Sequence, residues 1–177
     1  MLQKILVYGV VAGLVVGGSL SAIVVLAGGP QDSGVAIGYL VMLVGLSAVF
    51  VGVKRYRDQD LGGVIRFWPA FGLGLGISAV ASVLYVISWE ATVAFTQMDF
   101  AGTYVDMLIE QERAKGVSAE ALARFTAEME QFKAQYANPL FRLPMTFVEI
   151  FPVGVLVSLV SAALLRSSRF LPARAVA

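Results

Sequence analysis

The 177-residue chain contains no cysteine and no histidine. Without cysteine it can form no disulfide, thiolate nucleophile or cysteine-based metal site. Without histidine it lacks the commonest general base and metal ligand. Charge is also scarce, since 14% of the residues are charged, against about a quarter in a typical soluble domain. No nucleophile elbow, phosphate-binding loop or zinc motif occurs, so the sequence predicts a non-enzymatic protein and no cofactor or metal.

Apolar residues take the place of the missing charge. They make up 58% of the chain, and the mean hydropathy is +0.81. One small soluble core cannot bury this much apolar surface, so lipid is the expected solvent. Four apolar runs approach or exceed the roughly 20 residues that span a bilayer: 5–27, 34–53, 67–93 and 143–165. The predicted fold class is therefore all-α, a single integral membrane domain over residues 1–177 with a bundle of four transmembrane helices.

Basic residues cluster on one side of these runs. The short segments on that side hold eight of them: Lys4, Lys54, Arg55, Arg57, Arg66, Arg166, Arg169 and Arg174. The other side holds five, spread mostly through a longer loop. The positive-inside rule then predicts that both termini are cytoplasmic, and that the turn at residues 28–34 and the segment after Val93 lie outside. Four of the basic residues are candidate lipid-headgroup contacts, with a purely topological role as the alternative: Lys54, Arg55, Arg57 and Arg66.

The outer segment at residues 97–137 predicts a helical hairpin between the third and fourth spans. Gly116 suits the end of its first helix, and Ser118 suits the N-cap of the second. The second helix has an apolar stripe at spacings of three and four: Leu122, Phe125, Met129, Phe132 and Tyr136. The hairpin either packs on itself or on the bundle, or it binds a partner. Its four basic and seven acidic residues argue against nucleic acid.

Three blocks of sequence occur in an order that resembles a known family. They are "GYLVMLVGLSAVFVGVKRYRD", "YVISWE" and "NPLFRLPMTFVEIFPVGVLVSLVSA". Together they resemble the Domain-of-Unknown-Function 4199 family of small bacterial integral membrane proteins over roughly residues 34–166. The resemblance implies four membrane helices and a bacterial inner (cytoplasmic) membrane location, but it implies no reaction.

Two carboxylates fall within the third and fourth spans. Glu90 and Glu149 are expected at a similar depth, with Arg142 as the nearest basic partner of Glu149. An ionised carboxylate in a membrane is costly unless it is paired. The candidate polar site Glu90, Glu149 and Arg142 is therefore a structural link between two helices, a proton- or cation-linked site, or an acid and base acting on a lipid.

Glycines recur every fourth residue in the first span, at Gly9, Gly13 and Gly17. This spacing predicts close helix packing within the chain or, alternatively, homodimerisation. The leading functional hypothesis is a non-enzymatic membrane protein that binds lipids or a membrane partner and is able to oligomerise. The alternative is a small proton- or cation-linked transporter or channel that uses Glu90 and Glu149.

Overall fold

The structure is a computed structural model that describes residues 1–31 and 34–173. In this part of the chain it contains six α-helices and a π-helical turn, and no strand. The elements are α1 (Leu2–Ala27), α2 (Gly34–Arg55), η1 (Tyr56–Asp60), α3 (Phe67–Thr96), α4 (Phe100–Ala114), α5 (Ala119–Tyr136) and α6 (Pro139–Leu165). The all-α prediction is confirmed. Arg174 and part of the turn at residues 28–34 lie outside the described residues.

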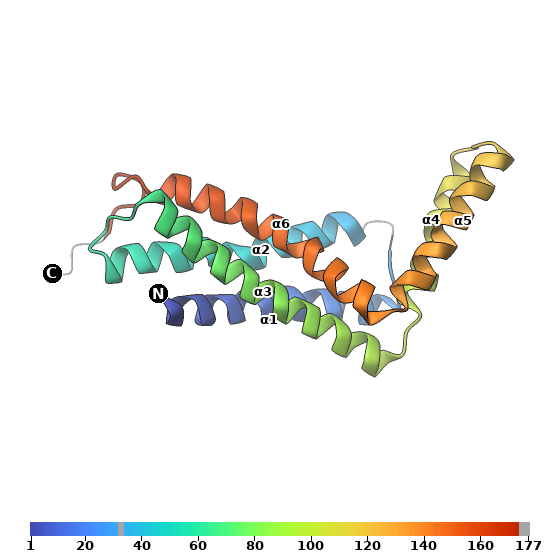
Figure 1. Cartoon of the computed structure of the whole chain (residues 1–177), viewed down its shortest axis with the longest axis horizontal. Coiled ribbons are helices and arrows are strands. Elements are labelled where there is room, and N and C mark those ends of the chain that lie inside the picture. The colour runs from blue at the N-terminus through green and yellow to red at the C-terminus, as the bar shows by residue number, and fades with distance from the viewer. Residues whose placement is uncertain (32–33, 174–177) are drawn as a thin grey trace.

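Four of these helices, α1, α2 with η1, α3 and α6, are long and apolar enough to cross a membrane. They pack against one another, as Figure 1 shows. The N-terminus, η1 and the end of α6 lie at one end of the group, and α4 and α5 project from the other end (Figure 1). Less than half of the most apolar window of each long helix is buried. Their outer surfaces are therefore apolar, as expected for a protein whose solvent is lipid.

All four long helices extend further than the sequence predicted, and the differences are largest in α3 and α6. α3 continues to Thr96, and α6 begins at Pro139 rather than at residue 143. The side chain of Asn138 caps α6 by accepting a hydrogen bond from the Leu140 backbone N–H at 3.0 Å. Proline is well suited to the first position of a helix, where its missing N–H would have no partner anyway. The Asn-Pro pair therefore both ends α5 and starts α6.

The glycine stripe of α1 packs directly against α3. A Cβ atom added at Gly9, Gly13 or Gly17 would lie 2.5–2.6 Å from a side-chain atom of α3. Only glycine permits this approach, so the prediction of packing within the chain is confirmed for this stripe. Because α3 covers this face, the face is not free for dimerisation through the first span.

Helices α3 and α6 meet through a reciprocal pair of small residues. Gly74 of α3 lies against Ser158 of α6, and Gly154 of α6 lies against Ser78 of α3. The two serine hydroxyls are 3.2 Å apart, and each also donates to a carbonyl in its own helix. The close contact thus brings polar groups together with their hydrogen bonds satisfied.

The segment between α3 and α6 forms the predicted helical hairpin. Gly116 lies between α4 and α5 with φ of 72°, and the hydroxyl of Ser118 caps α5 by accepting from the Ala121 N–H. The five residues of the predicted apolar stripe are all half-buried. At its base the hairpin is held to the long helices, since Trp89 of α3 donates a hydrogen bond to the Tyr136 hydroxyl at 2.8 Å.

Candidate functional site

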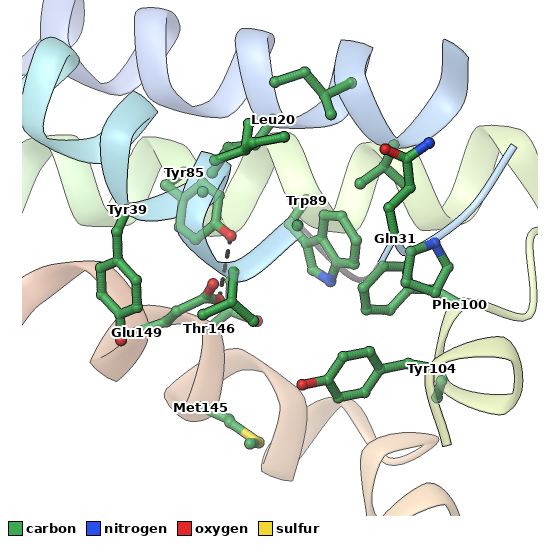
Figure 2. Close-up of a pocket in the computed structure, with 18 of the residues that line it drawn as sticks. Leu20, Gln31, Tyr39, Tyr85, Trp89, Phe100, Tyr104, Met145, Thr146 and Glu149 are labelled. Atoms are coloured by element: carbon green, nitrogen blue, oxygen red, sulfur yellow. Dashed lines mark hydrogen bonds between the residues drawn. The ribbon is translucent and has the colours of Figure 1, made fainter. Parts of the chain in front are cut away.

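A cavity of about 560 Å³ lies at the hairpin end of the long helices (Figure 2). Its wall is built from the end of α1, the start of α2, α3, the hairpin and the first half of α6. This volume is within the range of about 300–1,000 Å³ that is common for ligand pockets in proteins. It is larger than a second cavity of about 400 Å³ between α3 and the start of α6.

The floor and the mouth of the cavity come from different residues. The floor residues are buried in the protein: Met42, Tyr85, Trp89 and Thr146. The exposed lining residues come mainly from α2 and α6, where Tyr39 is 51% exposed and Val148 is 61% exposed. The cavity therefore opens sideways between α2 and α6, which are both candidate membrane spans.

Glu149 provides the carboxylate of this site. It is an exposed residue of α6, and the buried Tyr85 hydroxyl donates a hydrogen bond to its Oε2 atom at 3.2 Å. Figure 2 shows this bond beside Thr146. Among the described residues that line the cavity, Glu149 is the only acidic or basic one, apart from the weakly acidic tyrosines. The site therefore carries one negative charge whenever Glu149 is ionised.

Seven of the lining side chains are aromatic. Tyr39, Tyr85, Trp89 and Tyr104 surround the same space in Figure 2. Trp89 packs edge-to-face against Phe100, with ring centroids 4.7 Å apart. Such contacts and the Trp89–Tyr136 hydrogen bond fix the rings in place before any ligand binds.

The Tyr136 hydroxyl lies on the hairpin side of the cavity. Burial raises the pKa of this hydroxyl above its usual value, although the hydrogen bond from Trp89 acts in the opposite direction. A tyrosine with a raised pKa stays neutral at physiological pH. The hairpin therefore contributes a neutral polar group to the cavity.

Arg142 pairs with Glu90 and not with Glu149. Its Nε and Nη2 atoms each donate to a carboxylate oxygen of Glu90 at 2.6 Å. The prediction that Arg142 is the partner of Glu149 is wrong. Helical side chains point back toward the N-terminus of their helix, so the Arg142 guanidinium is directed away from the turn that carries Glu149. The two-bond ion pair joins α3 to α6, in agreement with the structural interpretation of these residues.

The two glutamates do not form a pair. Glu149 lies at the level of Tyr85, whereas Glu90 lies five residues further along α3, about 7.5 Å at the helical rise. The two carboxylates therefore lie more than one helical turn apart along the bundle, and their similar depth in a membrane stays a prediction. Glu90 is not among the cavity-lining residues, so the cavity reaches one of the two carboxylates.

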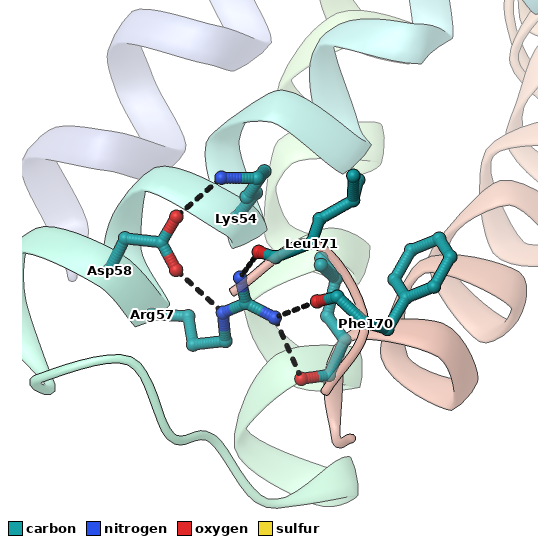
Figure 3. A network of polar contacts seen from close by, with 6 residues as sticks. Lys54, Arg57, Asp58, Phe170 and Leu171 are labelled. Atoms are coloured by element: carbon teal, nitrogen blue, oxygen red, sulfur yellow. Dashed lines mark hydrogen bonds and ion pairs between the residues drawn. The ribbon is translucent and has the colours of Figure 1, made fainter. Parts of the chain in front are cut away.

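The four candidate headgroup residues separate into different roles. Arg57 is fully buried, and its guanidinium donates to the backbone carbonyls of Phe170 and Leu171 and to Asp58 (Figure 3). It cannot contact a lipid headgroup, so that prediction is wrong for Arg57. Lys54 forms an ion pair with Asp58. Arg55 and Arg66 are exposed and remain candidates.

Sequence reasoning did not identify the aromatic part of the cavity. Tyr85 and Trp89 are four residues apart and face the same side of α3, which is the one local signal that could have indicated them. The other lining rings come from α2 and the hairpin, so their meeting depends on tertiary structure. Within residues 1–31 and 34–173, no group of three or more potential metal ligands comes together.

Four apolar helices and a cavity that opens between two of them define a helical protein suited to a membrane. The family model described as "Protein of unknown function (DUF4199)" matches residues 7–167, so the chain belongs to this family. The match includes most of α1, which the resemblance at residues 34–166 did not. No curated protein and no solved structure matches the chain.

Proposed function

We propose that this protein is a non-enzymatic integral membrane protein that binds an amphiphilic molecule of the bilayer in the cavity. The observation that carries the proposal is the sideways opening between α2 and α6. A cavity with an apolar and aromatic lining whose mouth lies between two membrane spans is accessible to molecules dissolved in the lipid. Tyr39 and Val148 at the mouth are exposed and would contact an entering apolar chain.

The proposed location is the inner membrane of a bacterium, with both termini in the cytoplasm and the α4–α5 hairpin outside. The basic residues named above support this orientation, because most of them lie near the end of the long helices that holds the N-terminus and η1. In this orientation the cavity lies toward the outer leaflet. Its ligand would then be an outer-leaflet lipid or another amphiphile that enters from that leaflet.

A proton- or cation-linked transporter that uses Glu90 and Glu149 is the competing function. The ion pair of Glu90 with Arg142 argues against it, because a carboxylate held by two charged hydrogen bonds is poorly suited to releasing and taking up a cation. The lining of the cavity is also mainly apolar. These features favour binding of an amphiphile over passage of an ion.

Two glycine variants test the proposal. An added Cβ meets no atom within 4 Å at Gly38, which lines the cavity, or at Gly72, which does not. Gly38→Phe should fill part of the cavity without disturbing the packing, and Gly72→Phe is the matched control. We expect native mass spectrometry of the purified protein to show co-purified lipid on the wild type and Gly72→Phe, and several-fold less on Gly38→Phe. Equal lipid on all three proteins would show that the cavity is not the binding site.

A further inference from the structure

The charge in the cavity has no cationic partner among the described residues that line it. Arg142, the basic residue two turns away on the same helix, is held by Glu90 through two hydrogen bonds of 2.6 Å. Glu149 receives a neutral hydrogen bond from Tyr85. A carboxylate between membrane helices costs several kcal/mol unless an opposite charge approaches it. A cationic ligand would supply that opposite charge.

The aromatic lining suits the same kind of ligand. The faces of tyrosine and tryptophan rings attract ammonium groups, especially where water is excluded. Tyr39 lies at the mouth of the cavity, and Tyr85 and Trp89 lie on its floor. A cation at the carboxylate would therefore have aromatic rings near it, both at the mouth and on the floor.

We infer that the bound amphiphile carries an ammonium group, which is recognised by Glu149 and the surrounding aromatic rings. This inference rests on the proposed function and adds the chemical class of the ligand. An anionic headgroup would meet the Glu149 carboxylate with no basic residue of the described lining to offset the repulsion. A neutral headgroup would leave the carboxylate uncompensated. The apolar tail would occupy the mouth between α2 and α6 and extend into the bilayer.

Long-chain probes of equal length isolate the contribution of the ammonium group. Trp68 is exposed and lies outside the cavity, so Trp68→Phe leaves Trp89 of the cavity as the sole tryptophan reporter. In this background, binding of tetradecylammonium and of tetradecanol is measured by Trp89 fluorescence in detergent micelles. We expect the ammonium probe to bind at least about tenfold more tightly. Glu149→Gln, which preserves the size of the side chain and an acceptor for Tyr85, should abolish this preference, so that the two probes bind with equal affinity.

A second variant guards against an effect of Glu149→Gln on folding. Tyr39→Leu removes an exposed ring at the mouth, and it should weaken binding of tetradecylammonium more than binding of tetradecanol.

Competition with phosphatidylethanolamine or phosphatidylglycerol then distinguishes a lipid headgroup from a free amphiphilic amine. Displacement of the bound probe by phosphatidylethanolamine alone assigns a lipid headgroup, and displacement by neither assigns a free amine.

The outcomes separate the two proposals. Equal affinity for both probes, no effect of Glu149→Gln, or displacement by phosphatidylglycerol would overturn the ammonium assignment and leave amphiphile binding in place. Binding of neither probe, or binding that Gly38→Phe does not weaken, would overturn the proposed function itself.

Discussion

Arg57 holds the chain that follows α6 against the end of α2. Its side chain is completely buried, and its guanidinium reaches the carbonyls of Phe170 and Leu171 at 2.9 and 2.5 Å. It also forms an ion pair with Asp58, which Lys54 contacts in turn. The planar guanidinium can donate in several directions at once, which a lysine ammonium at the same place cannot do in the same geometry.

Replacing Arg57 with lysine should therefore destabilise the protein although the charge is kept. We expect a loss of about 2–3 kcal/mol, because buried carbonyls lose charged hydrogen-bond donors. A lower melting temperature in detergent and faster proteolysis after α6 would report this loss. Arg55→Lys is the matched control, since Arg55 is the exposed last residue of α2, two positions before Arg57. Equal melting temperatures for the two variants would contradict the structural role of Arg57.

Sequence patterns identified the charged residues of the protein but not the residues with which they pair. The sequence showed the basic cluster after the second span. It did not show that Arg57 is buried while Arg55 is exposed, because the segment after α6 that covers Arg57 is distant in sequence. In the same way, Glu90, Arg142 and Glu149 were found, but their pairing depends on the direction of each side chain and the rotation of α3 against α6. Such details are set by tertiary packing.

At the scale of elements, the glycine stripe of α1 allows this helix to pack closely against α3. Gly13 lies where an added Cβ would come within 2.6 Å of the Leu84 Cβ and 3.1 Å of the Ala81 carbonyl oxygen. A backbone oxygen cannot rotate away as the end of a long side chain can. Gly18, on another face of α1, has no atom within 4 Å of the same construction. Within one helix, Gly13 is therefore tightly packed against α3, whereas Gly18 has free space beside it.

Alanine substitution at these two glycines should have opposite effects. Gly18→Ala should raise stability by up to about 1 kcal/mol, because alanine is the better helix former. Gly13→Ala should lower it by about 1–3 kcal/mol, because α1 and α3 must move apart. Thermal unfolding of the two variants beside the wild type measures both effects. Stabilisation by Gly13→Ala would show that α1 does not pack on α3 through this stripe.

The positions of the helices were more predictable from the sequence than the cavity between them. Length and hydropathy are local properties, and they predicted the four long apolar helices; Gly116 and Ser118 likewise predicted the turn of the hairpin. The start of α6 was missed because Asn138-Pro139 is compatible with both an end and a beginning of a helix. The cavity was missed because it arises from the placement of α2 relative to α6 and the hairpin, which no single segment encodes.

At the scale of the whole molecule, the two ends of the group of long helices carry different charged and aromatic residues. Lys4, Lys54 and Arg57 lie at the end opposite the α4–α5 hairpin, and all three are paired with acids. The hairpin end carries the aromatic cavity and an acidic pair of helices. A cavity at one end makes the orientation important, because it decides from which leaflet a ligand enters.

Because the chain contains no cysteine, single cysteines can report the orientation without background labelling. Ala127 is exposed on α5, and Ser168 is exposed in the segment after α6. In right-side-out membrane vesicles, an impermeant maleimide should label Ala127→Cys at once and Ser168→Cys only after permeabilisation, because the basic end of the helices is expected to stay in the cytoplasm. Inside-out vesicles should give the opposite result. A reversed pattern would place the cavity toward the inner leaflet, and labelling of both positions from one side would show that α6 does not cross the membrane between them.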